Sequence, residues 1–332
     1  MTDDIQRRPP TSVDVARAAG VSQATVSYVL NDNPNARVSE KTRERVREAA
    51  ARLGYVPHAS ARALRTGHSG LVLMPLPAAR TGRLAASWLD AIGDELAERG
   101  YTMVHYGERR LKGVPAAKVW AELRPVAILV DTDRLTRASV DLLRSSGTRA
   151  VLGMGDGPSD LVPSVVMDHR EIGALAARHL LARGRSRLAA IVPREEGIDE
   201  MGAARWRGVR EVAPQAERID LAFSEAEAGR LAVRDDLPDG IFAYNDEYAM
   251  LLISAFQDAG VRVPEDVAVV GADDLPIAKL MRPRLTSVGF QPTRTPAELV
   301  ALLDAVIRGE REFEAGEVIT LARPLLVARD SA

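Results

Sequence analysis

The residues whose types and spacing suggest chemistry fall into two groups, and the first lies in a short segment near the amino end. Small and hydrogen-bonding side chains recur there at helical spacing, opposite the apolar Val26 and Val29. A helix with such a face can enter the major groove of DNA, about 12 Å wide, and hydrogen-bond to base edges. The alternative is an ordinary helical hairpin with a polar outer face. The candidate residues are Ser22, Gln23, Ala24, Thr25, Ser27, Tyr28 and Asn31.

The second group could hold a small molecule. Asn245 and Asp273 each follow an apolar run typical of a strand, and their amide and carboxylate could each hold a pair of hydroxyl groups, as a sugar or nucleoside requires. The alternative for Asn245 is the N-cap of the next helix. Aromatic residues make up only 4% of the chain, so platforms for stacking on a ring are scarce. The candidates by position are Trp88, Tyr106, Trp206 and Phe242.

Two short helices must position the first group. Thr11 supplies an N-cap oxygen with Asp14 in the capping-box position, Gly20 permits the sharp bend that ends the first helix, and Ser22 caps the second. A third helix is expected from Glu40 to Leu53, closed by Gly54. We expect its apolar positions to face inward and its basic positions to make phosphate contacts of low specificity. The inward positions are Val46, Ala49, Ala50 and Leu53.

Charge is distributed unevenly along the 332 residues, although the net charge is only −2. Residues 1–68 contain 11 Lys/Arg and 7 Asp/Glu, a net charge of +4, whereas the remainder contains 33 and 39, a net charge of −6. The basic end is therefore the end expected to meet nucleic acid.

Enzyme classes find little support. The chain has no cysteine, and its five histidines stand in no metal-binding or catalytic motif. The loop from Gly153 to Gly157 lacks the following helix that a nucleotide-binding loop requires. We expect no catalysis, metal or cofactor. The amino end has no apolar leader and no later run reaches the roughly eighteen apolar residues of a membrane helix, so we expect a cytoplasmic protein.

The segment HASARALR, from His58 to Arg65, suits a helix of about two turns that is too short to be stable alone. With TSVDVARAAGVSQATVSYVLN and VSEKTRERVREAAARLGYVP, it resembles the headpiece and hinge of the lactose-repressor (LacI/GalR) family. The resemblance implies that the hinges of two subunits fold together in the minor groove, with His58 and Ala61 among the contacts and Leu64 wedged into a base step. The alternative for Leu64 is packing on the core. Tyr28 and His58 depart from the family's usual arginine and asparagine, which leaves the operator sequence open.

From Gly70 onward, short apolar runs alternate with amphipathic segments, which predicts parallel sheets covered by helices on both faces. The runs expected as strands are 71–76, 101–106, 126–130 and 149–152, and those expected as helices are 84–99 and 135–145. Helix-ending glycines recur before the strands, as in Glu98-Arg99-Gly100-Tyr101.

This part of the chain resembles the family's effector domain, which has the fold of a type I periplasmic sugar-binding protein. The matching segments include Ile241 to Asp246, Gly271 to Asp274 and Arg282 to Val288. The resemblance implies an α/β core of two lobes, a ligand cleft between them, and crossovers near Asp168, Gly289 and Leu321. Asp168 itself is expected to be structural. Arg205, in Arg205-Trp206-Arg207-Gly208, matches the family's ligand-gripping arginine, whose planar fork suits vicinal oxygens or a carboxylate.

The first lobe departs from the family. Where members usually carry acid, amide and aromatic residues after the first strand, this chain has Pro75 to Leu84 without them. Arg80 and Arg83 in this segment could favour an anionic effector or could simply be solvated. A sugar effector is therefore a family expectation that the sequence weakens, and a regulator that has lost its effector is an alternative.

The expected organisation is a helix-turn-helix headpiece at 1–57, a hinge at 58–68 and a core at 69–332. Within the core, one lobe is expected at about 69–167 and 290–320, and the other at about 168–289 and 321–332. We expect a homodimeric repressor that binds a pseudo-palindromic operator on double-stranded DNA under the control of a small-molecule effector. The rival interpretation is a solute-binding protein of sugar transport, against which the headpiece and the absence of a signal peptide argue.

Overall fold

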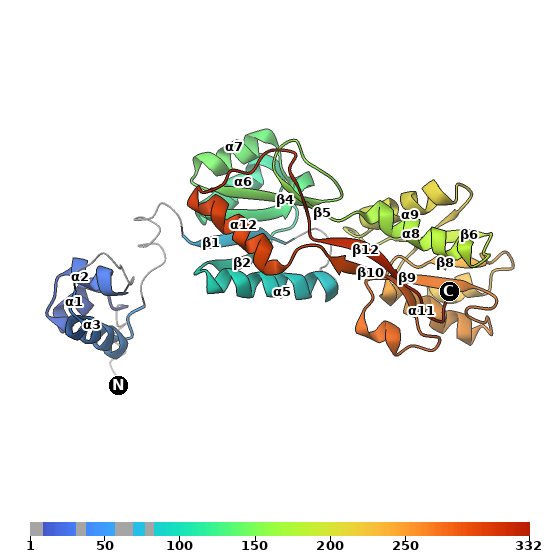
Figure 1. Cartoon of the computed structure of the whole chain (residues 1–332), viewed down its shortest axis with the longest axis horizontal. Coiled ribbons are helices and arrows are strands. Elements are labelled where there is room, and N and C mark those ends of the chain that lie inside the picture. The colour runs from blue at the N-terminus through green and yellow to red at the C-terminus, as the bar shows by residue number, and fades with distance from the viewer. Residues whose placement is uncertain (1–8, 31–37, 57–68, 77–82) are drawn as a thin grey trace, which may run out of the picture. The chain divides into compact units, whose positions relative to one another are not determined.

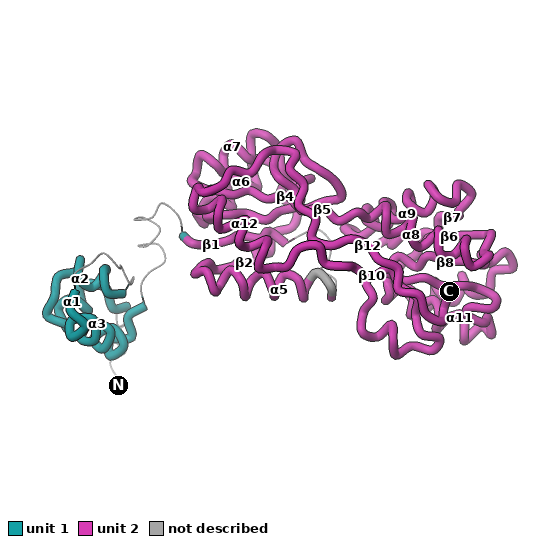
Figure 2. The backbone as a smooth tube through the Cα atoms, viewed as in Figure 1, with its two compact units in different colours: residues 1–69 teal, residues 70–332 magenta. Residues whose placement is uncertain are grey.

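The computed structural model describes residues 9–30, 38–56, 69–76 and 83–332 of the chain. These residues form two compact units, which comprise Met1–Ser69 and Gly70–Ala332 (Figure 2). No helix in the described ranges is long and apolar enough to span a membrane.

The described residues of the first unit form the helices α1 (Ser12–Ala19), α2 (Gln23–Leu30) and α3 (Glu40–Leu53) (Figure 1). The predicted capping box is present, because the Thr11 hydroxyl accepts a bond from the Asp14 amide and the Asp14 carboxylate accepts one from the Thr11 amide. Gly20 has φ 62° and ends α1, and Gly54 has φ 64° and ends α3, as the sequence predicted. The core of this unit consists of Val15, Ala16, Ala19, Val26, Val29, Val46, Ala49 and Ala50.

Leu53 was expected to face inward, and this was wrong. Its side chain is 37% exposed and lines a shallow surface depression with Asp14, Arg17 and Ala18. Ala50, one turn earlier, is buried in the three-helix core and Tyr55 packs against this core, whereas Leu53 is not among its residues.

The strands described in the second unit form two six-stranded sheets. The order of the first sheet is β11 (Val318–Thr320), β5 (Ser164–Val166), β4 (Ala150–Gly155), β3 (Ala127–Asp131), β1 (Leu71–Pro75), β2 (Thr102–Tyr106). All of its neighbouring strands are parallel. Two hydrophobic clusters lie on its faces, one with α5 (Arg83–Glu98) and α12 (Pro296–Arg308), the other with α6 (Gly113–Glu122) and α7 (Arg137–Ser145). This lobe is a sheet covered on both sides (Figure 1).

The order of the second sheet is β12 (Ala322–Val327), β10 (Thr286–Pro292), β9 (Ala268–Ala272), β8 (Gly240–Phe242), β6 (Leu188–Pro193), β7 (Glu217–Leu221). Its neighbouring strands are parallel except β10 and β12, which are antiparallel. The cluster on one face includes α8 (His169–Ala182) and α9 (Asp199–Val212), and the cluster on the other includes α10 (Glu225–Ala232) and α11 (Asp246–Asp258). The predicted α/β fold with two lobes and largely parallel sheets is confirmed.

The chain passes between the sheets where β5 is followed by α8, where β10 is followed by α12, and at Leu321 between β11 and β12. Strand β10 continues beyond Gly289 to Pro292, where it still pairs with β12. In open α/β sheets, ligands usually bind outside the carboxyl ends of the strands, so the loops that follow these ends are the place to look for a site.

Helices α8 and α9 approach each other through glycine. A Cβ atom on Gly173 would lie 1.8 Å from the Arg205 carbonyl oxygen, and one on Gly208 would lie 1.8 Å from the Arg170 carbonyl oxygen. Neither position can hold a side chain without separating the helices. These two contacts fix the backbone of Arg205 against α8.

Candidate functional site

The polar stripe predicted for DNA contact lies on α2. Gln23, Ala24 and Tyr28 are exposed, Tyr28 at 42%, while Thr25 and Ser27 are half-buried and Val26 and Val29 are buried beneath them. The helix thus presents one polar face and packs the other into the three-helix core.

Part of this stripe is held by local hydrogen bonds. The Ser22 hydroxyl caps α2 by accepting the amide of Thr25 at 3.1 Å, and the Gln23 amide nitrogen donates to the Ser12 hydroxyl at 2.9 Å. These bonds fix the start of α2 against α1. Asn31, His58, Ala61 and Leu64, the other predicted DNA contacts, lie outside the described residues.

In the second unit, Arg205, in the middle of α9, lies at the centre of a buried polar cluster that includes the start of α8 and the residues that follow β8 and β9. Its guanidinium donates to the Tyr244 carbonyl oxygen at 2.5 Å and to Nδ1 of His169 at 3.3 Å, and lies 3.8 Å from a carboxylate oxygen of Asp273. The guanidinium carbon also stands 4.7 Å from the centre of the Tyr244 ring. The side chain is only 5% exposed, so these contacts hold the arginine in a single direction.

His169 connects this cluster to the first lobe. Because Arg205 can only donate, Nδ1 of His169 must accept, and the ring proton of the neutral form sits on Nε2. Nε2 lies 3.5 Å from a carboxylate oxygen of Asp156, which directly follows β4. Burial and the neighbouring Arg205 lower the pKa of His169 to about 3, so the imidazole is neutral near pH 7 and its contact with Asp156 is not an ion pair.

Asp273 is carried by a strained turn after β9. Asp273 has φ 98° and Asp274 has φ 45°, a region that side-chain-bearing residues rarely adopt. Burial raises the pKa of the Asp273 carboxyl, while the Arg205 guanidinium opposes this effect. Arg205 thus offsets part of the effect of burial on this carboxyl.

The buried Asp246 holds this turn in place. Its two carboxylate oxygens accept bonds from the Ser287 hydroxyl and the Leu275 amide, each at 2.6 Å. The Asp274 amide in turn donates to the Ser287 hydroxyl at 3.1 Å. Strands β9 and β10 are thereby joined below Asp273.

The other two predicted effector residues have structural contacts. The side-chain oxygen of Asn245 accepts the Tyr248 amide at 3.0 Å and caps α11, which was the alternative for this residue. Trp88 lies on α5 and packs, half-buried, against the core of the first lobe. Asp168 caps α8 by accepting the Glu171 amide at 2.9 Å.

Besides His169 and Asp156, sequence reasoning missed four further residues of this region, Tyr244, Tyr248, Phe223 and Glu195. Tyr248 packs edge-on against Tyr244 and Phe223, at centroid distances of 5.7 Å and 5.3 Å, and its hydroxyl donates to Glu195 at 2.5 Å. Phe223 is 53% exposed and follows β7, so its ring is accessible at the same sheet edge. Tyr244 has φ 61°. The only sequence signal for them is their position at the ends of apolar runs.

Two known protein families match this chain. The family described as bacterial regulatory proteins, lacI family, matches residues 12–58, and the periplasmic binding protein-like domain matches residues 177–332. A HTH-type transcriptional regulator GntR from Pseudomonas aeruginosa is 32% identical over 88% of this chain and 86% of its own length. The chain belongs to the lacI family.

Other members of the family are similar to this LacI-family chain over most of its length. A HTH-type transcriptional repressor PurR from Photobacterium profundum is 31% identical over 86% of this chain and 87% of its own. Among solved structures, a Lac repressor bound to ONPG in the repressed state is 26% identical with a TM-score of 0.74, covering 98% of this chain and 100% of that one. A CelR–cellobiose complex is 27% identical with a TM-score of 0.63, covering 97% and 100%.

The LacI-family chain is thus a DNA-binding transcriptional regulator rather than an enzyme, as the sequence predicted. The rival interpretation, a transport solute-binding protein, is set aside because the DNA-binding family matches the headpiece that such a protein would not need. The α2 stripe and the Arg205 cluster occupy its two functional units, one in each.

Proposed function

We propose that this regulator is a homodimeric repressor that binds a pseudo-palindromic operator with one headpiece on each half-site. The exposed polar face of α2 over a buried apolar face supports insertion of α2 into the major groove. Gln23, Ala24 and Tyr28 would meet base edges, with Ser22, Thr25 and Ser27 beside them. Asn31 would extend the stripe, and a hinge at 58–68 would bring His58, Ala61 and Leu64 to the minor groove.

We also propose that Arg205 and Asp273 grip the effector in the cleft between the lobes. A guanidinium that donates and a carboxylate that accepts, 3.8 Å apart, suit adjacent hydroxyl groups of a sugar or nucleoside. The accessible Phe223 ring would cover an apolar face of such a ring. Asn245 would contribute only its amide nitrogen, because its oxygen caps α11, and Trp88 would border the site from the first lobe.

The contact between His169 and Asp156 supports control by lobe orientation. It links the effector arginine in the second lobe to the end of β4 in the first. An effector that binds Arg205 would change the hydrogen bond from Arg205 to His169. The contact of His169 with Asp156 would then change too, which would favour one arrangement of the lobes. A coupling of about 1–3 kcal/mol would change operator occupancy roughly 5- to 150-fold.

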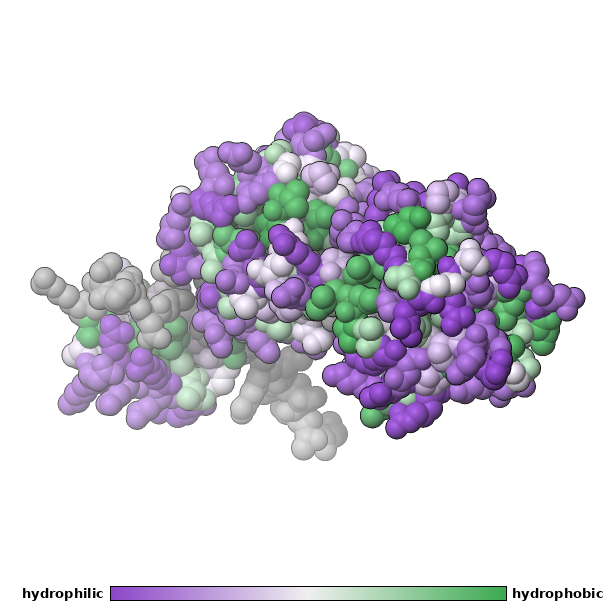
Figure 3. Space-filling model, turned by 45° about the vertical axis from the view of Figure 1, so that its right-hand side comes forward, coloured by the Kyte–Doolittle hydropathy of each residue, from purple (hydrophilic) through white to green (hydrophobic). Residues whose placement is uncertain are grey.

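Apolar side chains on the second lobe support a dimer. Ile277 and Leu280, on and beside the short helix η2 (Pro276–Lys279), are 40% and 71% exposed, and Met250 on α11 is 39% exposed. Helix η2 packs on the same core as α11 through Ala278. We propose that these side chains lie in the subunit contact. Figure 3 shows apolar patches separated by hydrophilic surface on the face that it presents.

The decisive experiment replaces Arg205. Operator sequences would first be selected from random duplexes, and sugars, sugar phosphates and nucleosides screened by thermal shift. Arg205→Lys keeps a cation beside Asp273 but removes the planar fork, so it should abolish the thermal shift and the effector's influence on operator binding. Operator affinity without effector should stay within about threefold of wild type. Arg210→Ala, on the exposed side of the same helix, is the control. An effector response retained by Arg205→Lys would place the ligand elsewhere.

A further inference from the structure

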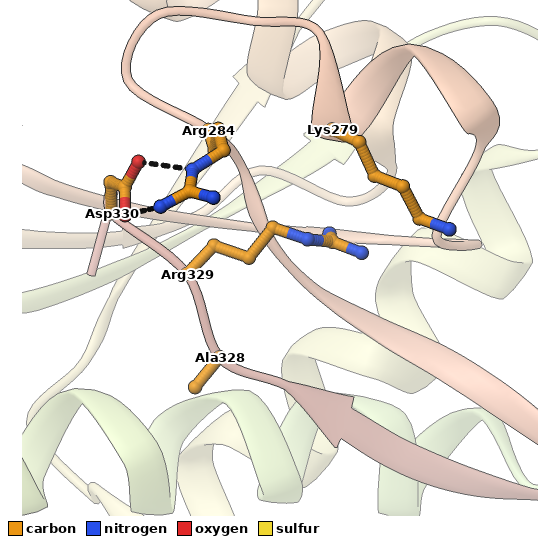
Figure 4. A pocket seen from close by; sticks show the side chains of 5 residues that line it. All are labelled: Lys279, Arg284, Ala328, Arg329 and Asp330. Carbon is orange, nitrogen blue, oxygen red and sulfur yellow. Dashed lines mark hydrogen bonds and ion pairs between the residues drawn. The ribbon is translucent and has the colours of Figure 1, made fainter.

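A cavity of about 520 Å³ lies on the second lobe, lined by Lys279, Arg284, Ala328, Arg329 and Asp330 (Figure 4). Lys279 ends η2, Arg284 precedes β10, and the last three residues follow β12. Figure 4 shows the side chains of Arg284, Arg329 and Lys279 around one space. The volume is within the range of small-molecule sites, about 300–1,000 Å³.

The charges that line this cavity are predominantly positive. Its lining includes three cationic side chains but only one carboxylate, that of Asp330. Asp330 pairs with Arg284 at 2.7 Å and 3.1 Å, but both side chains are about half exposed, so water screens this pair and a stronger anion can compete for Arg284. Lys279 has no hydrogen-bond or ion-pair partner among the described residues. The cavity therefore has more positive than negative side chains, which favours the binding of an anion from solution.

Arg329 gives the cavity a fixed donor. Its side chain is only 11% exposed, and its guanidinium donates to the Asp274 carboxylate at 2.5 Å and to the Leu285 carbonyl oxygen at 2.6 Å. A held guanidinium loses little conformational freedom when it binds a further oxyanion. Together with the exposed ammonium group of Lys279, it matches the several oxygens of a phosphate group.

We propose that this cavity is an anion site, separate from the Arg205 cluster, for a small molecule that carries a phosphate or another multiply charged oxyanion. The site shares one side chain with the turn that holds Asp273, because Arg329 binds the adjacent Asp274. A bound anion would compete with Asp274 for that guanidinium and so weaken the ion pair between Arg329 and Asp274. Anion binding stands independently of the proposed effector function, whereas its influence on the effector rests on that function.

Pyrophosphate titration of the full chain by calorimetry, at constant ionic strength, tests the site. Wild type should bind one pyrophosphate per chain at this cavity, and Lys279→Ala/Arg284→Ala should bind it at least tenfold more weakly. The matched control is Lys118→Ala/Arg262→Ala, which removes the same charge from exposed positions. Arg262 pairs with Asp266 on the surface much as Arg284 pairs with Asp330.

Asp274→Asn supplies a test that a folding defect cannot imitate. It removes the carboxylate that neutralises Arg329, and asparagine tolerates the positive φ of this position, so pyrophosphate should bind several-fold more tightly. Arg205→Lys should bind pyrophosphate as wild type does. The proposal is overturned if wild type binds none, if both double variants lose affinity equally, or if Asp274→Asn gives no gain. A loss in Arg205→Lys would assign the anion to the effector cleft instead.

Discussion

Replacing Asp246 with asparagine should remove a pH dependence from the stability of the second lobe. The Asp246 side chain is fully buried, and this burial raises the pKa of its carboxyl from the ordinary 3.8 to about 7, despite the bonds from Ser287 and Leu275. The unfolded chain keeps the ordinary value. Folding therefore binds a proton between these two pKa values, and the stability contributed by this group falls as the pH rises through that window.

The magnitude follows from the shift. Each unit of pKa corresponds to about 1.4 kcal/mol, so the ionised carboxylate lowers the free energy of unfolding by about 4 kcal/mol once the pH exceeds 7. Between pH 5 and pH 8 the loss is about 3 kcal/mol. Asparagine keeps the hydrogen bonds, because its oxygen can accept from the Leu275 amide and its NH₂ can donate to the Ser287 hydroxyl.

Urea denaturation at pH 5, 6, 7 and 8, followed by circular dichroism and tryptophan fluorescence, measures the effect. The stability of wild type relative to Asp246→Asn should fall by about 3 kcal/mol across this series, since all other titrating groups are common to both proteins. Asp258→Asn, at the exposed end of the same helix, should retain the wild-type slope. A difference between wild type and Asp246→Asn that stays constant within about 0.5 kcal/mol would refute the assignment.

Three further substitutions test the headpiece, the hinge and the α8–α9 contact. Leu64→Ala should remove most specific operator affinity in a binding assay but leave salt-sensitive nonspecific binding, and equal loss of both would contradict a wedge role. Tyr28→Ala should change the preferred base at one half-site position in a binding-site selection, by about 1–3 kcal/mol, and an unchanged preference would remove Tyr28 from base recognition. Gly208→Ala should destabilise the chain by more than about 3 kcal/mol in thermal melting, because its Cβ would overlap the Arg170 backbone. Gly229→Ala, which meets nothing within 4 Å, should not.

The headpiece was predictable because its signals are local. Thr11, Asp14, Gly20 and Gly54 act within one helical turn of themselves, and the structure uses each as the sequence indicated. The alternation of apolar runs and helices likewise fixed the α/β class. Leu53 shows the limit of such reasoning, because it shares the helical spacing of the buried Val46, Ala49 and Ala50 and is nevertheless exposed.

The Arg205 cluster could be predicted only in part. Arg205 was predicted from the family resemblance and Asp273 from its place after an apolar run, and the two do lie together. The contacts of Arg205 with His169 and Tyr244, however, join segments more than thirty residues apart, which no local pattern encodes. Asn245 illustrates a different obstacle, since an amide after a strand suits a ligand and a helix cap equally well. Phe223 and Tyr248 belong to no motif.

The meeting of α8 and α9 backbone to backbone has a mechanical consequence for signalling. Arg205 cannot slide along α8, because its own carbonyl oxygen abuts Gly173, nor can the two axes separate without losing the reciprocal contact at Gly208. Under the proposed function, a metabolite that pulls on the guanidinium would therefore move α8 and α9 together, with His169 at the start of α8. Residues around the proposed effector site could then be exchanged to suit another ligand without disturbing the α8–α9 contact.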